Sequence, residues 1–290
     1  MQMLITAVIA SDYIVKYTVD STAIPDVQIG DFKVSFVSKM EAMRLYKNRN
    51  VEKIYRNTIK HVAEVQSMPT WGIDRIDDLG LDKLYNYPSS AGEGTTAYIV
   101  DTGINTNHTD FGNRATFGFD ATNEGFFDGH GHGSHVAGTV SGLLYGVAKK
   151  AEVVAVKVLG TDGYGDDAGI IKGLEFVVAD AKLRRTKATI NMSIGGELSQ
   201  VLDDAVNAVV KQGIVVIVAA GNENQNACNS SPAAAKEAIT VGATDSRDRK
   251  AGFSNWGPCV DINGPGVNIK SVWKGTTTGT NTISGYLLFI

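Results

Sequence analysis

Residues 214–220 have the sequence Ile-Val-Val-Ile-Val-Ala-Ala, an apolar run with the length of one strand. Three other stretches have the same character, namely TTAYIV at 95–100, VVAVKVL at 153–159 and ATINMSI at 188–194. Predicted helices separate them, at about 133–144, 166–183 and 198–211. Near-continuous apolar strands that alternate with helices are typical of a parallel sheet that is buried on both faces. The sequence therefore predicts an α/β fold with a doubly wound parallel sheet.

The first 64 residues differ from the rest of the chain in charge and in pattern. They carry 9 Lys and Arg and 7 Asp and Glu, a net charge of +2, whereas residues 65–290 carry 18 and 24, a net charge of −6. Strands are predicted at 12–19, 33–37 and 51–55, and a helix capped by Ser38 at 39–46. We therefore expect a small α/β module at 1–64 and a larger domain at 65–290, with the polar stretch 56–70 as the linker.

The composition of the whole chain excludes several classes of protein. Among its 290 residues are 27 Lys and Arg and 31 Asp and Glu, and 43% are apolar, as in ordinary globular proteins. The net charge of −4 argues against a nucleic-acid partner, and no apolar run reaches the roughly 20 residues that cross a membrane. We therefore expect a monomer that binds neither nucleic acid nor a membrane. Residues 3–10 (MLITAVIA) fit a first strand or an incomplete signal peptide, and both interpretations stay open.

Three polar residues stand where predicted strands end or a predicted helix begins. Asp101 closes the strand at 95–100, His132 opens the helix at 133–144, and Asn222 follows the strand at 214–220. The carboxyl ends of parallel strands meet at one edge of a sheet, where ligands bind. An acid, a histidine base and an amide donor are three parts of a nucleophilic acyl-transfer site. Taken singly, each residue also fits a plain turn or helix start.

Five stretches that include these residues resemble the subtilisin-like serine proteases, on the branch of proteinase K, aqualysin and cerevisin. They are YIVDTGI, DGHGHGSHVAGT, INMSIGG, VAAGNENQNACNSSPA and FSNWGPCVDINGPG, in the order and spacing of that family. The resemblance implies a serine endopeptidase that acts on polypeptides and requires no cofactor. It makes Asp101 the acid, His132 the general base and Asn222 the oxyanion donor.

The resemblance also implies where a substrate binds. Two segments resemble the family's edges that pair with an extended peptide, and their glycines let a substrate backbone approach closely. They consist of Gly163, Tyr164 and Gly165 on one side and of Ser193, Ile194, Gly195 and Gly196 on the other. Ordinary turns at a sheet edge are the alternative interpretation.

Cys228 and Cys259 are the only cysteines, and they match positions that form a disulfide in aqualysin-like relatives. Such a bridge implies an oxidising compartment, and hence the secretory pathway, with secretion or a vacuolar location. Two reduced, buried thiols are the alternative.

Asp261 resembles a calcium-ligating aspartate of proteinase K, with the backbone carbonyls of Lys236 and Ala238 as further ligands. Structural calcium is therefore one expectation for this position. An aspartate that is hydrogen-bonded within a turn is the other.

Residues 1–64 resemble the inhibitory propeptide of the family, so the chain resembles a zymogen. Only 13 residues separate Val19 from Lys33, too few for the usual first helix and its flanking strand. We therefore expect an abbreviated propeptide.

The resemblance ends near the family's nucleophile, which lies in a Gly-Thr-Ser-Met-Ala run. The chain follows the family through Thr282-Ile283-Ser284-Gly285 and continues as Tyr-Leu-Leu-Phe-Ile, so that Leu287 falls where the serine belongs. We expect Ser284 to be a loop residue that is not presented to His132. We therefore expect this chain to be inactive and truncated, with one apolar surface of its sheet uncovered.

Other functions compete with a protease. His130, His132 and His135 have nearly the spacing of a zinc-binding run, but no histidine follows them, which argues against a zinc hydrolase. A pseudoprotease that binds peptides, or that inhibits related proteases through residues 1–64, is the alternative that stays open. A product without any function is the third.

Overall fold

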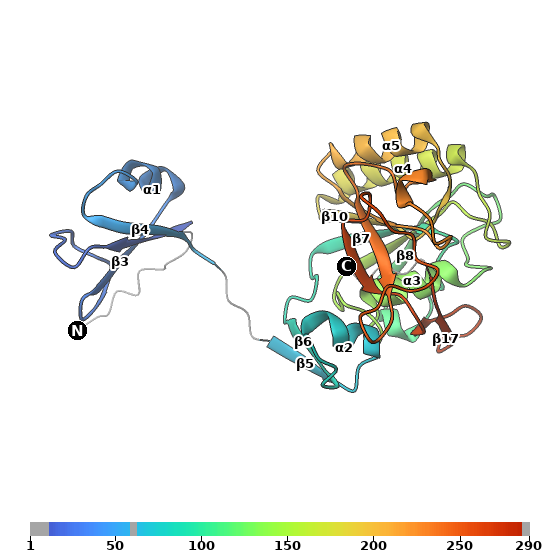
Figure 1. Cartoon of the computed structure of the whole chain (residues 1–290), viewed down its shortest axis with the longest axis horizontal. Helices are drawn as coiled ribbons and strands as arrows, with labels where there is room; N and C mark the ends of the chain where they lie inside the picture. Colours follow the sequence, from blue (N-terminus) through green and yellow to red (C-terminus); the bar gives the residue numbers. More distant parts are fainter. Residues whose placement is uncertain (1–11, 59–62, 286–290) are drawn as a thin grey trace. The chain divides into compact units, whose positions relative to one another are not determined.

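The computed structural model describes residues 12–58 and 63–285. The chain divides into two compact units, residues 1–61 and residues 62–290, and each is described by itself (Figure 1). The stretch MLITAVIA and the position of Leu287 lie outside the described residues.

The first unit is a four-stranded antiparallel sheet, in the order β2-β3-β1-β4, with one helix. Ser38 caps the helix by accepting a hydrogen bond from the backbone N–H of Glu41, as its sequence position predicts. Val15, Val37 and Ala42 are buried between sheet and helix. The elements are β1 (Tyr13–Tyr17), β2 (Val27–Ile29), β3 (Phe32–Val37), α1 (Lys39–Leu45) and β4 (Val51–Arg56).

Two details of this region bear on the sequence interpretation. The 13 residues between Val19 and Lys33 hold no helix and only a three-residue strand, β2, which pairs with β3 around a turn at Gly30, so they do not contain both a helix and a flanking strand. The predicted linker is too long, since β5 (Ala63–Ser67) pairs with β6 (Leu84–Pro88) in the second unit. Strand β5 has a polar sequence, AEVQS, and backbone pairing rather than an apolar face holds it.

The second unit contains a seven-stranded parallel sheet, in the order β15-β14-β12-β10-β7-β9-β8. This arrangement confirms the α/β prediction. Its order turns back at β7, because the next two strands lie on one side of β7 and the later strands on the other. The strands are β7 (Thr95–Asp101), β8 (Ala115–Asp120), β9 (Glu152–Lys157), β10 (Lys187–Met192), β12 (Val215–Ala219), β14 (Ile239–Thr244) and β15 (Ile262–Pro265).

Helices cover both faces of this sheet. Helices α4 (Asp167–Arg184) and α5 (Gln200–Val210) lie on one face and α3 (His132–Ser141) on the other (Figure 1). Alternate residues of β7 serve the two layers, because Tyr98 packs in the cluster under α4 and α5 whereas Ile99 packs in the cluster under α3. A ligand crevice is therefore expected at the carboxyl end of β7, where the strand order turns back.

The remaining elements of the second unit are short. They are α2 (Trp71–Asp77), η1 (Thr109–Phe111), β11 (Gly196–Glu197), η2 (Ala227–Asn229), β13 (Ser230–Ser231), β16 (Ile269–Val272) and β17 (Thr280–Ile283). Among the described residues, no helix combines the length and the apolar character that crossing a membrane requires.

The apolar surface that the sequence predicts to be uncovered is exposed only in part. Val215 of β12 and Ile262 of β15 are 45% and 53% exposed. Ile217, Ala219 and Val241, on the same side of the sheet, are buried in a small cluster of their own.

Candidate active site

Asp101 and His132 are joined at the carboxyl end of β7. The carboxylate of Asp101, the last residue of β7, is completely buried, and the side chain of His132, the first residue of α3, is 18% exposed. Nδ1 of His132 lies 2.8 Å from Oδ1 and 2.9 Å from Oδ2 of Asp101. The proton between them therefore belongs on Nδ1, which leaves Nε2 as an acceptor.

The glycines around His132 permit this contact. Gly131 adopts a φ of 105°, and a side chain there would meet the ring of Trp273. A side chain on Gly133 would overlap the carbonyl oxygen of Gly103 and approach Cβ of Asp101. Only glycines at these two positions let the start of α3 lie directly against the end of β7.

Asp128 orders the turn that leads into α3. Its Oδ1 accepts hydrogen bonds from the backbone N–H of Gly131 at 2.7 Å and from the hydroxyl of Thr102 at 2.9 Å. Its Oδ2 accepts from the backbone N–H and the hydroxyl of Ser134. The site predicted from the sequence assigns no role to Asp128, although an aspartate followed by glycine is a turn signal.

The surroundings of His132 change its pKa. Burial lowers the pKa of the imidazole, but the charge and hydrogen bond of Asp101 and the charge of Asp128 outweigh this effect, and the net pKa is raised above 6.5. His135, one turn further along α3, is fully buried, and its burial lowers its pKa to about 4. The two histidines therefore differ in charge over a wide range of pH.

Two of the three neighbouring histidines have partners within the protein. Nε2 of His135 bonds to the carbonyl of Ile269 at 2.9 Å, whereas Nδ1 of His132 is engaged by Asp101. The described residues contain no group of three or more His, Cys, Asp or Glu side chains that could hold a metal ion.

Asn222 lies just beyond the carboxyl end of β12, two strands away from β7. Its backbone N–H bonds to Oε2 of Glu223 at 2.9 Å. Its side-chain amide faces Gly285, where an added Cβ would lie 2.6 Å from Nδ2. The structure thus places the amide next to the last described residue of the chain.

Both predicted substrate edges line one groove of about 600 Å³ together with His132. Gly163–Gly165 forms one side of the groove and Ser193–Gly196 the other. Apolar residues including Leu159, Ile170 and Leu202 complete the wall. Two glycine-containing segments that line one groove are an arrangement that can pair with an extended peptide through backbone groups.

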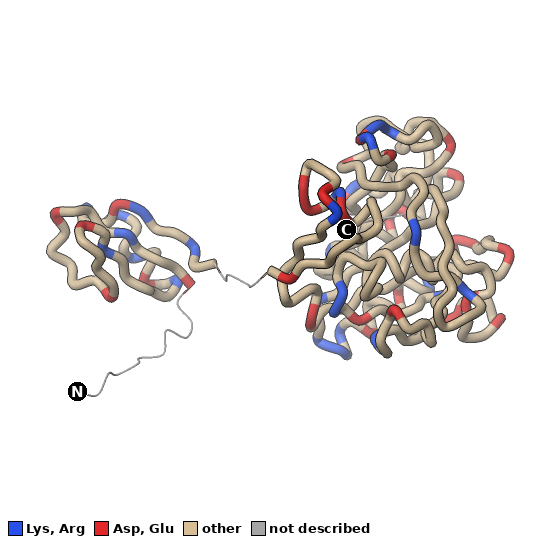
Figure 2. The backbone as a smooth tube through the Cα atoms, turned by 90° about the horizontal axis from the view of Figure 1, so that it is seen from below, with Lys and Arg blue, Asp and Glu red and all other residues tan. Residues whose placement is uncertain are grey.

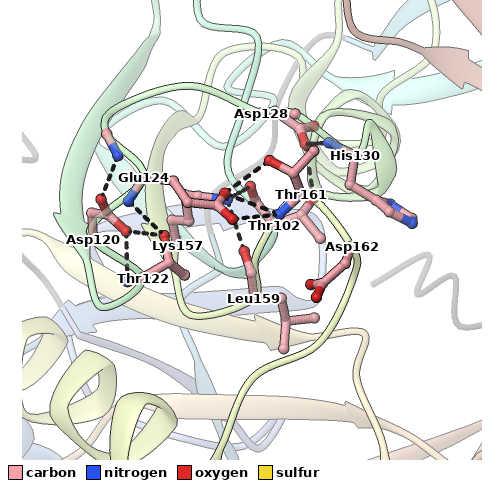
Figure 3. A network of polar contacts seen from close by, with 12 residues as sticks. Thr102, Asp120, Thr122, Glu124, Asp128, His130, Lys157, Leu159, Thr161 and Asp162 are labelled. Atoms are coloured by element: carbon pink, nitrogen blue, oxygen red, sulfur yellow. Dashed lines mark hydrogen bonds and ion pairs between the residues drawn. The ribbon is translucent and has the colours of Figure 1, made fainter.

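A buried lysine connects the end of β7 with the Gly163 side of the groove. Lys157, the last residue of β9, is 0% exposed, and its Nζ donates to the carbonyls of Thr102 at 2.9 Å and Leu159 at 2.8 Å. Nζ also pairs with Oε2 of Glu124 at 3.1 Å, and Glu124 accepts hydrogen bonds from the backbone and hydroxyl of Thr161 (Figure 3). The site predicted from the sequence does not include Lys157, although a single lysine in the apolar strand VVAVKVL is a signal for a buried cation.

The cysteine prediction is confirmed, because Cys228 and Cys259 form a disulfide with a Cα–Cα distance of 5.4 Å.

The calcium site that the resemblance implies stays a prediction, and the contacts of Asp261 show a structural role beside it. Oδ2 of Asp261 accepts a hydrogen bond from the backbone N–H of Thr240 at 2.8 Å, and the backbone N–H of Asp261 donates to the carbonyl of Thr240. These contacts make Asp261 a residue that fastens the segment before β15 to β14. Oδ2 is used in the contact with Thr240, and a site made of one carboxylate and two backbone carbonyls is neither supported nor excluded by the lack of a larger acidic cluster among the described residues.

Ser284 is not a partner of His132. Its hydroxyl accepts a hydrogen bond from the backbone N–H of Asn268 at 2.8 Å, in a loop after β17, which confirms the prediction for this residue. Within residues 12–58 and 63–285, His132 bonds through Nδ1 and its backbone N–H, and no hydroxyl bonds to Nε2.

Comparisons of the sequence with known proteins point to one family. Residues 92–287 match the model of the subtilase family. The chain is 51% identical over 231 residues to a putative subtilase-type proteinase, isp6, of Schizosaccharomyces pombe, covering 77% of this chain and 49% of isp6. It is 44% identical to a cuticle-degrading serine protease of Arthrobotrys oligospora, covering 85% and 62%, and 47% identical to cerevisin of Saccharomyces cerevisiae, covering 82% and 40%.

A solved structure shows the same fold. A cold-adapted subtilisin-like serine proteinase superposes with a TM-score of 0.72 at 45% identity, covering 76% of this chain and 80% of that one. The chain spans about half the length of the curated relatives it matches.

Proposed function

The chain belongs to the subtilase family, and we propose that it carries the acid, the base and the oxyanion donor of a serine endopeptidase. The observation that carries this proposal is the paired contact of Asp101 with Nδ1 of His132 at the side of a groove suited to an extended peptide. The raised pKa of His132 is a further support, because it indicates that the carboxylate stabilises the imidazolium form.

Each residue has a role that follows from its contacts. Asp101 holds the imidazole so that Nε2 faces away from it and can accept the hydroxyl proton of a serine. The serine oxygen would attack the peptide carbonyl, and His132 would return the proton to the leaving amine. Asn222 would donate a hydrogen bond to the carbonyl oxygen as it becomes negative, a contribution of about 10²–10³ in rate in subtilisin.

The described residues supply no nucleophile for this chemistry. The hydroxyl of Ser284 is engaged by the backbone of Asn268, so Ser284 is not presented to Nε2 of His132. We therefore propose that the 290-residue chain does not hydrolyse peptides by itself and that hydrolysis requires a serine presented to His132. The alternative activity is peptide binding without cleavage, which both formed edges of the groove favour.

The first unit is proposed to act as the propeptide of the second. Its compact antiparallel sheet with one helix is consistent with a separately folded segment. The disulfide supports a location in the oxidising secretory pathway, either outside the cell or in a vacuole-like compartment.

A graft of the nucleophile tests this function. Residues 286–290 are replaced by a subtilase C-terminal segment that begins Thr-Ser-Met-Ala, so that Gly285 completes the Gly-Thr-Ser-Met-Ala run of the family. The completed protein should hydrolyse a chromogenic peptide and react with a fluorophosphonate, whereas the 290-residue chain should do neither. Reaction of the 290-residue chain with the fluorophosphonate at a serine would refute the proposal that it lacks a nucleophile.

A further inference from the structure

The groove beside His132 is lined by carboxylates. Asp162, Asp166, Asp167 and Glu197 all contribute to its wall, and no Lys or Arg is among the lining residues. Elsewhere the two signs of charge are interspersed along the backbone of both units (Figure 2). The concentration of negative charge is therefore a property of this groove and not of the whole surface.

None of these four carboxylates is neutralised by a cation of the described residues. Asp162 accepts from the backbone N–H of Tyr164 at 3.0 Å, and Asp166 caps α4 by accepting from Gly169 at 2.8 Å. Asp167 accepts from the hydroxyl of Ser199 at 2.5 Å. All these donors are uncharged, and the amino end of α4 adds only about half a positive charge. The groove consequently keeps a negative potential.

Apolar side chains lie next to these charges. Ile170, Ile194 and Leu202 are buried in the same wall, and half-buried Asp167 precedes Ile170 by three residues on α4, so these two share one face of the helix. A lysine or arginine side chain suits such a surface, because its aliphatic stem can pack against the apolar wall while its charged end reaches a carboxylate. A shorter side chain would lack the packing of the stem against the apolar wall, and a negatively charged side chain would lack the attraction to the carboxylate.

A second acidic side chain lies behind Asp167. Asp203 is only 4% exposed, and Oδ1 of Asp203 has no hydrogen-bond partner in the described part of the chain. Burial raises the pKa of Asp203, a hydrogen bond with Ser231 lowers it, and the charges of Asp204 and Asp167 raise it again. Asp203 therefore adds a further acidic group near Asp167 and no positive charge.

We propose that the groove selects extended peptides that carry a lysine or arginine side chain between the Gly163–Gly165 and Ser193–Gly196 edges. This inference rests on the proposed function, since it takes the groove to be the peptide site. Asp167 is the main partner of the cationic end, because it is half-buried and lines the same groove as the apolar residues. Exposed Asp166 and Glu197 add attraction at longer range.

Peptide binding to the full 290-residue chain tests the proposal without requiring hydrolysis. Fluorescein-labelled octapeptides of alanine and glycine carry one arginine, norleucine or glutamate at each position in turn, and their Kd values are measured by anisotropy. At the best position, arginine should bind about tenfold more tightly than norleucine, which corresponds to about 1.4 kcal/mol. Glutamate should bind least, and 0.5 M NaCl should reduce the preference for arginine.

Conservative variants locate the effect. Asp167→Asn keeps an acceptor for Ser199 and should remove most of the preference for arginine, and Glu197→Gln should remove a smaller part. Asp245→Asn, at an exposed turn where Arg249 pairs with the carboxylate, should leave the preference unchanged. Equal Kd values for arginine and norleucine peptides would overturn the inference and leave the proposed peptide site intact. Failure of every peptide to bind would overturn both.

Discussion

Nζ of Lys157 lies 3.1 Å from Oε2 of Glu124, although the lysine side chain is completely buried and the glutamate side chain is 35% exposed. Two backbone carbonyls, those of Thr102 and Leu159, share the same ammonium group. A buried charge is stable only when its donors are all used, and Lys157 uses three. The pair therefore fastens the segment after Asp101 to the loop that forms one side of the groove.

Replacing this lysine should destabilise the second unit. Lys157→Met fills the same space but leaves two carbonyls without a donor, so the free energy of unfolding should fall by about 2–4 kcal/mol. Urea denaturation of the full chain measures this loss. Lys150→Met is the matched control, because Lys150 and Glu64 are both 43% exposed and their ion pair should contribute less than about 1 kcal/mol. Equal losses for the two variants would show that the buried pair has no special role.

The pKa of His132 should depend on the charge of Asp101. In Asp101→Asn the negative charge is gone, so the pKa of His132 should fall from its raised value, because burial is then opposed only by the charge of Asp128. Titration of the imidazole by NMR in the full chain follows this change. Asp245→Asn serves as a control that removes a carboxylate elsewhere. A His132 pKa that is unaltered by Asp101→Asn would mean that the contact does not exist in solution.

The disulfide should contribute substantially to stability. It closes a segment with a sequence separation of 31 residues, and a loop of this size corresponds to about 3–4 kcal/mol in the chain-entropy description. The double variant Cys228→Ser, Cys259→Ser should lose this amount in thermal or urea unfolding. A reducing agent should lower the stability of the parent chain by a similar amount and leave the double variant unaffected. If reduction has no effect on the parent chain, the cysteines are not bridged.

His135 should make the protein less stable in acid. Its pKa is about 4 in the folded chain and near 6.5 when unfolded, so the unfolded state binds the extra proton first. Its contribution is fully present above pH 6.5 and is lost as the pH falls toward 4, by up to about 3 kcal/mol. His132 has the opposite sign, because its raised pKa adds stability below pH 6.5 that is lost as the pH rises through the folded value. Comparing the parent chain with His135→Gln in urea at pH 4.5 and 7.5 isolates the first effect, and an equal difference at both values would contradict it.

The sequence predicted the elements with strong apolar character and missed those without it. Strands β7, β9, β10 and β12 are apolar on both faces, so their existence and their parallel pairing follow from pattern alone. Strand β5 lies within the predicted linker, because its alternate residues, Glu64 and Gln66, are polar and give no strand signal. Its place is decided by hydrogen bonds to β6, a partner that no local pattern reveals.

The candidate site shows the same division. Motifs with several residues at fixed spacing located Asp101 and His132, and the structure brings these two together. The roles of Asp128 and Lys157 depend on atoms that meet from separate segments, Thr102 in both cases. Those contacts arise from the way β7, β9 and α3 converge, which sequence spacing does not express.

The most direct test of the account is the activity of His132 in the completed protein. With the serine segment grafted after Gly285, peptide hydrolysis should appear and should fall by about 10⁴-fold or more in His132→Ala, as in subtilisin. The rate should also rise with pH through the raised pKa of His132, because only the neutral imidazole accepts the serine proton. Hydrolysis that persists in His132→Ala at the parental rate would contradict the assignment of His132 as the general base.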